Sequence, residues 1–177
     1  FRYTAAKVSG ETTQIGGIEP VAFAKSMNVT MDSGKVSDLS GKTLLVERDR
    51  AKDLGLKVGD SVKMSIAGTE ASYSVVGIFE ALPNIWSAYL TSLDAVSSAG
   101  LTPADNLAYV VRSPGADARQ VRAGIDAVIA DLPTITLKDQ AEFAAEQRAP
   151  IDQMLMLIYA LLGLAVVIAV LGIINTL

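Results

Sequence analysis

Cysteine and histidine are both absent from the 177 residues of this chain. Without cysteine, the chain can form no disulfide and can supply no thiolate nucleophile. Without histidine, it lacks the commonest general base and the commonest zinc ligand of proteins. A Ser-His-Asp triad, a Cys-His dyad and a histidine-based metal site are therefore excluded. A membrane-anchored hydrolase would have to rely on carboxylates, and these form no clear pair, so we expect neither catalytic nor metal-binding residues.

An excess of positive charge is also missing. The chain has 15 Lys and Arg against 19 Asp and Glu, which gives a formal net charge of -4. No block of basic residues stands out, whereas binding to nucleic acid phosphates needs clustered Lys and Arg. Nucleic acid is therefore not an expected partner. Half of the residues are hydrophobic and 19% are charged, which indicates a folded chain.

Charge of either sign disappears at the carboxyl-terminal end. Residues 154–177 contain no Asp, Glu, Lys or Arg over 24 positions. As a helix this segment would be about 36 Å long, against a membrane hydrocarbon core of roughly 30 Å. The alternative is a buried core helix, which needs a larger protein shell than the preceding residues easily supply. We therefore predict a transmembrane helix over 154–177, in contact with membrane lipid.

Small residues recur along this predicted transmembrane helix. Ala165 and Ala169 lie four residues apart, as do Gly172 and Thr176, and such pairs allow a second helix to approach closely. The polar Asn175 lies beside the second pair. These five residues are the predicted contacts with a neighbouring membrane helix.

The segment before it, residues 138–153, is rich in Ala, Glu and Gln, which favour helix. We predict a stalk helix continuous with the transmembrane helix, with a kink or restart at Pro150; a loose linker is the alternative. Arg148, Pro150 and Asp152 are the candidate coupling residues. Acidic residues outnumber Lys138 and Arg148 here, so the tendency of basic residues to stay cytoplasmic places residues 1–153 outside the cytoplasm.

Residues 1–137 alternate between strand and helix patterns, which predicts an α+β domain with a small mixed or antiparallel sheet and packed helices. Pro20 and Gly55 mark the start of one helix and the end of another. An amphipathic helix follows residue 117. The expected strands cover 1–9, 43–47, 61–66, 71–80, 107–112 and 134–137, and the expected helices begin near 20, 48, 92 and 118.

Three short motifs resemble functional sites but have plainer interpretations. The MDSG string at 31–34 is similar to an aspartic protease motif, but no second copy exists, so we expect an ordinary turn. The LSGKT string at 39–43 lacks the glycine that a phosphate-binding loop needs at Val36, and a strand is expected after it. The pair Gly59 and Asp60 is expected to form a tight turn.

The only tryptophan lies in the segment 82–90, LPNIWSAYL. Trp86, Pro83 and Tyr89 are candidates for binding a partner, because exposed aromatic residues often anchor protein interfaces. Packing of Trp86 in the core is the alternative.

Two strings in the chain are shared with one known family. The first is an A…LGL…GD segment, with Ala51, Leu54, Gly55, Leu56, Gly59 and Asp60 at the matching positions. The second is the closing GIxNTL string, with Gly172, Ile173, Asn175, Thr176 and Leu177. Because these strings occur in the same order and at similar spacing, the chain resembles the FtsX/MacB-like family of ABC-transporter permeases from Leu39 onward.

This resemblance implies an extracytoplasmic domain between two transmembrane helices, of which the second is present here. It also implies that ATP binds to a separate cytoplasmic ATPase subunit, so no cofactor is expected in this chain. Further implied partners are a second permease half or copy and an extracytoplasmic protein. A single-pass membrane-anchored binding or sensor domain is the alternative, and the sequence beyond Leu177 would distinguish the two.

Overall fold

The computed structural model describes residues 1–82, 85–101 and 104–176, with the side chains of the last two residues outside the description. Its contacts divide the chain into two compact units, Phe1–Val111 and Arg112–Leu177. The predicted extracytoplasmic domain over 1–137 thus extends beyond the first unit into the second.

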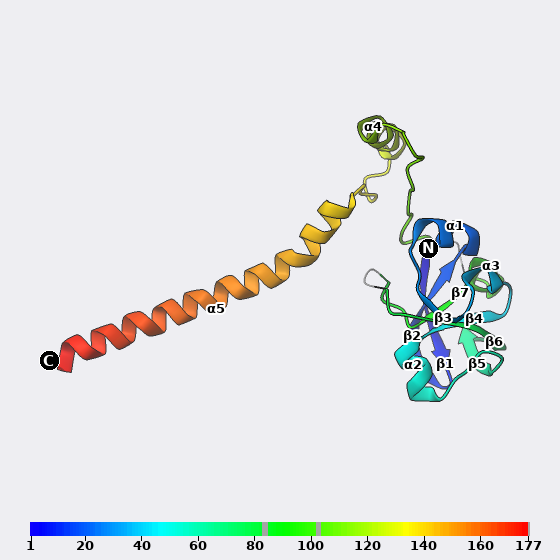
Figure 1. Ribbon diagram of the computed structural model, residues 1–177, viewed down its shortest axis with the longest axis horizontal. Helices are drawn as coiled ribbons and strands as arrows, with labels where there is room; N and C mark the ends of the chain where they lie inside the picture. Colours follow the sequence, from blue (N-terminus) through cyan, green and yellow to red (C-terminus); the bar gives the residue numbers. More distant parts are fainter. Residues whose placement is uncertain (83–84, 102–103, 177) are drawn as a thin grey trace. The chain divides into compact units, whose positions relative to one another are not determined.

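The first unit contains one mixed sheet whose strand order is β3-β6-β4-β7-β2-β1-β5. An additional antiparallel pairing of β5 with β6 closes the ring β1-β2-β7-β4-β6-β5 into a barrel (Figure 1). The strands are β1 Arg2–Val8, β2 Glu11–Ile18, β3 Met31–Gly34, β4 Thr43–Glu47, β5 Ser61–Ile66, β6 Thr69–Phe79 and β7 Tyr89–Ser92. The predicted mixed sheet is confirmed, while its closure was not anticipated.

Strand β6 makes the closure geometrically feasible because it is 11 residues long. Its first half pairs with β5 in an antiparallel ladder, and its second half pairs in parallel with β4. The short strand β3 adds to the free edge of that second half. The pairing of β2 with β7 is also parallel, so the ring combines antiparallel hairpins with two parallel pairs.

The barrel interior is filled by apolar side chains that come from every strand of the ring. A second apolar cluster lies on the outer side and includes residues of α1 and of the 3-10 helix η1 (Val36–Asp38). Strand β4 serves both clusters: Leu44 and Val46 belong to the inner cluster, and Leu45 belongs to the outer one. Side chains alternate between the faces of a strand, which explains why three consecutive apolar residues are all fully buried.

The edge strand β3 approaches β6 so closely that it requires a glycine. Gly34 has a φ of +71°, and a Cβ atom there would lie 2.0 Å from the carbonyl oxygen of Val76. The MDSG string is therefore a strand, and the expectation of an ordinary turn was wrong. The register against β6 shifts by one residue between Met31 and Ser33, and this irregularity and the glycine hide the strand pattern in the sequence.

The short helices begin and end where the sequence predicted. Helix α1 (Pro20–Ser26) starts at Pro20, and helix α2 (Arg48–Leu54) ends at Gly55, whose φ is +65°. Helix α3 (Leu93–Ser98) is capped by the Ser92 hydroxyl, which accepts from the backbone N–H of Ala95 at 3.1 Å. The Gly59–Asp60 pair forms the expected turn, in which the Asp60 carboxylate accepts from the Lys57 backbone N–H at 2.7 Å.

Two predicted strands are wrong. Residues 107–112 and 134–137 have β-branched side chains, yet neither segment pairs with another strand in the part of the chain that the structure describes. Val110 and Val111 are 61% and 60% exposed. Strand formation needs a pairing partner as well as suitable side chains, and the described residues supply none.

The second unit consists of helices α4 (Ala118–Ile129) and α5 (Gln140–Thr176). The Asp117 carboxylate caps α4 by accepting from the backbone N–H groups of Arg119 and Gln120. The amphipathic pattern of α4 was predicted correctly, but no residue of this helix is buried, and Val128 is 77% exposed. Packing of this helix on the sheet of the first unit stays a prediction.

Candidate membrane span and partner surface

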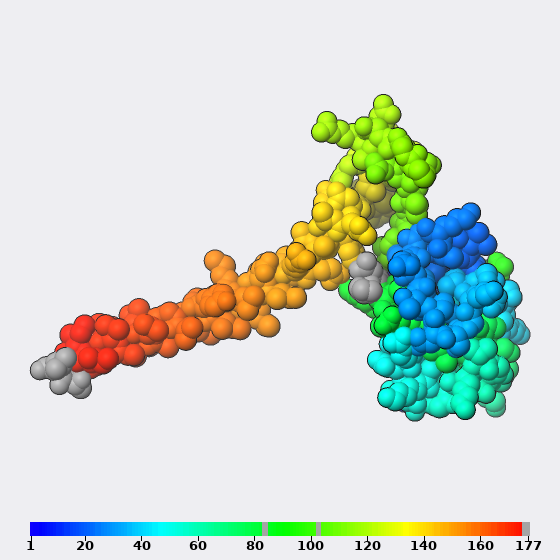
Figure 2. All heavy atoms as spheres, in the orientation of Figure 1, coloured from blue at the N-terminus to red at the C-terminus, as the bar shows by residue number. Residues whose placement is uncertain are grey.

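Helix α5 is long and apolar enough to cross a membrane, by its length and composition. It runs for 37 residues without interruption, and its most apolar 18-residue window has a mean hydropathy of 2.9. Within the described residues, no part of that window is buried. Figure 2 shows the side chains of its orange-to-red part at the surface. Helix α5 is therefore a candidate membrane span, since a lipid bilayer offers apolar surroundings to such a helix.

The charged first part and the uncharged second part belong to the same helix (Figure 1). Pro150 lies inside α5 and does not end it, because the helix continues to Thr176. The predicted continuity of the stalk with the apolar segment is therefore confirmed. Arg148 and Asp152 are exposed on this helix, and neither forms an ion pair with another described residue.

The predicted helix-packing residues follow one side of α5. Ala165, Ala169 and Gly172 are exposed, and their spacing of four and then three residues keeps them on one face. Asn175 and Thr176 continue the helix backbone, but their side chains lie outside the description, as does Leu177. Contact of these residues with a second helix stays a prediction.

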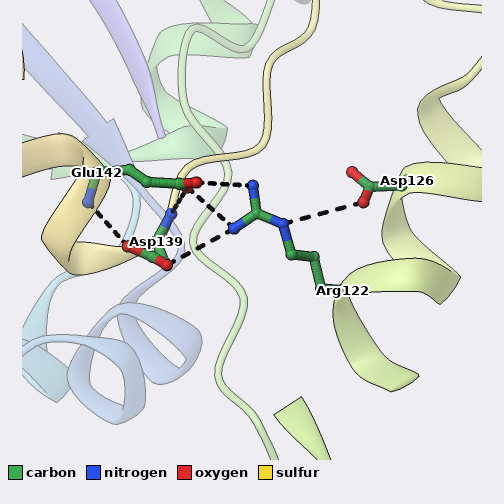
Figure 3. A network of polar contacts seen from close by, with 4 residues as sticks. All are labelled: Arg122, Asp126, Asp139 and Glu142. Carbon is green, nitrogen blue, oxygen red and sulfur yellow. Dashed lines mark hydrogen bonds and ion pairs between the residues drawn. The ribbon is translucent and has the colours of Figure 1, made fainter. Parts of the chain in front are cut away.

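A network of charged side chains joins the two helices of this unit (Figure 3). The Arg122 guanidinium of α4 donates two hydrogen bonds to the Glu142 carboxylate of α5, at 2.9 and 3.0 Å. It also lies 3.6 Å from a carboxylate oxygen of Asp139 and 4.0 Å from one of Asp126. The hydrogen bonds to Glu142 raise the pKa of Arg122 above its usual range.

The N-terminus of α5 is capped by reciprocal hydrogen bonds between Asp139 and Glu142. The Asp139 carboxylate accepts from the Glu142 backbone N–H, and the Glu142 carboxylate accepts from the Asp139 backbone N–H, each at 2.8 Å. This arrangement is a capping box, with Asp in the place of the usual Ser or Thr. We did not identify it from the sequence, although the Asp-x-x-Glu spacing at 139–142 was a usable signal.

The Trp86 side chain is 71% exposed on the first unit, so the core-packing alternative is wrong. Its backbone N–H donates to the Tyr3 hydroxyl at 3.3 Å. Beside it lies a cavity of about 290 Å³, whose lining includes Phe79, Ile85 and Glu47. Exposed aromatic rings often anchor protein interfaces, and the lining of this cavity offers both polar and apolar groups to a partner.

The other two candidates of this segment differ from Trp86. Tyr89 is fully buried in the inner cluster, where its hydroxyl accepts from Nε of Arg50 at 3.0 Å. Arg50 also pairs with Glu11, and the bond to Tyr89 is the main cause that raises the pKa of Arg50. Tyr89 therefore stabilises the barrel and does not present its ring to a partner. Pro83 lies outside the described residues.

A cluster of charged side chains around Arg48 connects the edge strand β3 to helix α2. Arg48, at the start of α2, forms a two-pronged contact with the Asp32 carboxylate of β3 and a hydrogen bond of 3.3 Å to Glu80. The Arg48 contact lowers the pKa of Asp32 below its ordinary value. Among the described residues, no group of three or more Asp or Glu is placed to hold a metal ion.

No family model matches this chain, and no curated protein matches it. Among solved structures, it is similar to a domain from Porphyromonas gingivalis described as a "putative Permease protein". The two share 17% identity with a TM-score of 0.47 over 73% of this chain. The matched region spans 60% of the length of that structure. At this level of similarity the likeness carries no argument about function.

Proposed function

We propose that this chain is the extracytoplasmic domain and following transmembrane helix of an ABC-transporter permease subunit of the FtsX/MacB-like type. One observation carries the proposal: the charged stalk and the uncharged apolar segment form one uninterrupted helix, Gln140–Thr176. The sequence resemblance over the LGL…GD and GIxNTL strings supports the same assignment.

In this proposal the chain transmits motion and catalyses no reaction. A separate cytoplasmic ATPase subunit binds ATP, and a second permease half or copy contacts α5 at the Ala165, Ala169 and Gly172 face. Displacement of the apolar part of α5 then moves its stalk part, because a rigid helix transmits displacement that a flexible linker would absorb. Pro150, with Arg148 and Asp152 around it, lies where the stalk would leave the membrane.

The proposal places residues 1–153 outside the cytoplasm. The stalk region carries Lys138 and Arg148 against four carboxylates, and basic residues close to a span favour the cytoplasmic side. The exposed Trp86 ring and its neighbouring cavity would then face an extracytoplasmic protein. That protein would be either the next component of an export path or an outer enzyme that the permease activates.

A single-pass membrane-anchored binding or sensor domain is the second candidate, and the exposed Trp86 surface also fits it. Both candidates need a membrane helix, but only the permease needs a stiff stalk. The reading frame beyond Leu177 separates them, because further hydrophobic spans favour the permease and a signalling domain favours the sensor.

The stalk test uses the full-length protein with its ATPase partner in lipid nanodiscs. One variant carries a seven-residue Gly-Ser insertion after Pro150, and the matched control carries a seven-residue helix-forming insertion there. Seven residues add about two helical turns, so the control keeps the helix phase. The readout is the ATP-dependent change in distance between a spin label on the first unit and one on α5.

The Gly-Ser insertion should abolish this ATP-dependent change and leave ATP hydrolysis in place. The helix-forming insertion should preserve both. An unchanged distance response in the Gly-Ser variant would show that the stalk transmits no motion, and the permease proposal would then lose its mechanism.

A further inference from the structure

The interaction between α4 and α5 depends on Arg122. Its guanidinium reaches the first turn of α5 from a different helix, 20 residues earlier in the chain. The contact is two-pronged, with both terminal nitrogens donating to the two oxygens of Glu142 (Figure 3). Two-pronged Arg–carboxylate contacts are more directional than single ion pairs, and so they fix orientation as well as proximity.

The acceptor is held in place before Arg122 binds it. The Glu142 carboxylate already accepts the Asp139 backbone N–H at 2.8 Å, as half of the capping box. Exposed ion pairs contribute little when two free side chains must be immobilised to form them. Here the capping box has already restricted Glu142, so less side-chain freedom is lost when Arg122 binds.

A second contact strengthens the same connection. Lys138, in the segment between the helices, pairs with Glu146 one turn further along α5. Glu142 and Glu146 are four residues apart and lie on one face of the helix. The segment before α5 is therefore attached to the first two turns of the stalk on a single side.

We propose that Arg122, Asp139 and Glu142 form a latch that makes α4 and the start of α5 move as one body. In the permease proposed above, α4 and its exposed apolar residues would then move together with the stalk part of α5. That consequence rests on the proposed function. The latch itself depends only on contacts within this unit.

The test measures the distance between α4 and α5 in the full-length protein in nanodiscs, without ATP. The 177 residues contain no cysteine, so labels at Ala127→Cys and Ala145→Cys report on this unit; both positions are exposed. The latch variant is Arg122→Gln. Its matched control is Arg119→Gln, because Arg119 is on the same helix and forms no side-chain ion pair with another described residue.

The native protein and the Arg119→Gln variant should give a narrow distance distribution, and Arg122→Gln should broaden it. Glu142→Gln provides a second route, because glutamine at this position keeps the capping box while losing the charge. The Arg122→Gln/Glu142→Gln double variant should be no broader than either single variant, since all three lack the same contact.

A narrow distribution in Arg122→Gln, or additive broadening in the double variant, would overturn the latch. Circular dichroism with native helix content would show that broadening comes from motion and not from unfolding. Because no ATP or transport is involved, a failed latch leaves the permease proposal standing. A failed stalk test likewise leaves this measurement valid.

Discussion

Two arginines introduced at the centre of α5 should remove its membrane insertion, whereas one should only weaken it. The segment 155–174 contains thirteen Leu, Ile and Val residues. Each contributes about 0.3–0.6 kcal/mol to insertion near the helix centre, which sets an upper bound of about 4–8 kcal/mol for the segment. One central arginine costs about 2.5–3.5 kcal/mol, which this segment can offset.

The proposed variants are Val166→Arg and the double variant Leu162→Arg/Val166→Arg. Val166 and Leu162 are 57% and 60% exposed on α5. In the double variant the arginines cost about 5–7 kcal/mol, and the lost Leu and Val add about 1 kcal/mol. The cost of the two substitutions is then about as large as the favourable insertion free energy of the whole segment. Insertion should therefore become inefficient in the double variant and persist in the single one.

The assay is resistance of the 177-residue chain to extraction from membranes by alkaline carbonate, because α5 is the one candidate span among its described residues. A matched control is Val21→Arg, because Val21 is 59% exposed on α1 and far from α5 in sequence. That control should stay in the membrane like the native protein. If the double variant resists extraction equally well, α5 does not anchor the protein and the reasoning from hydropathy is refuted.

The remaining predictions concern the edge strand β3, measured by thermal unfolding of the full chain in mild detergent. Gly34→Ala should lower the unfolding midpoint far more than Gly55→Ala, because both glycines have positive φ but only Gly34 has an atom within 2.0 Å of the added Cβ; equal effects would contradict the close approach. Asp32→Asn should destabilise the protein near pH 6, and the difference from native should vanish as pH falls well below 3.8, the ordinary pKa of Asp32. The lowered pKa means that the Arg48 contact stabilises the fold above that value and is lost on protonation, so a pH-independent difference would exclude this contact as the cause.

The sequence predicted those elements whose signals are local. Pro20, Gly55 and Ser92 mark helix ends through their own backbone and side-chain chemistry, and α1, α2 and α3 have the expected bounds. Strands β4, β5 and β6 were also recognised, because they carry dense β-branched and apolar residues. Charge-free composition alone identified the apolar part of α5.

The errors concern pairing, which no single segment encodes. Strand β2 contains the Gly16–Gly17 pair and a polar beginning, and it is a strand only because β1 and β7 flank it. Residues 107–112 have strong strand propensity and no described partner. Closure of the barrel likewise depends on the length of β6 and on which edges it meets.

The candidate sites show the same limit. Exposure of Trp86 and burial of Tyr89, three residues later, follow from the start of β7 and could not be read from residue types. The Arg122 latch needs a contact across 20 residues, although its capping box was visible as Asp-x-x-Glu. Long-range side-chain contacts become predictable only once the helices are placed.

The central claim is that α5 enters the membrane while its stalk part lies outside the cytoplasm. The most direct measurement is reaction of single cysteines with a membrane-impermeant maleimide in intact cells, in a full-length protein otherwise free of cysteine. Cysteine in place of Ala145 should react without permeabilisation, and cysteine in place of Ala165 should stay unreactive in intact and permeabilised cells. Reaction at 165, or reaction at 145 only after permeabilisation, would contradict the account.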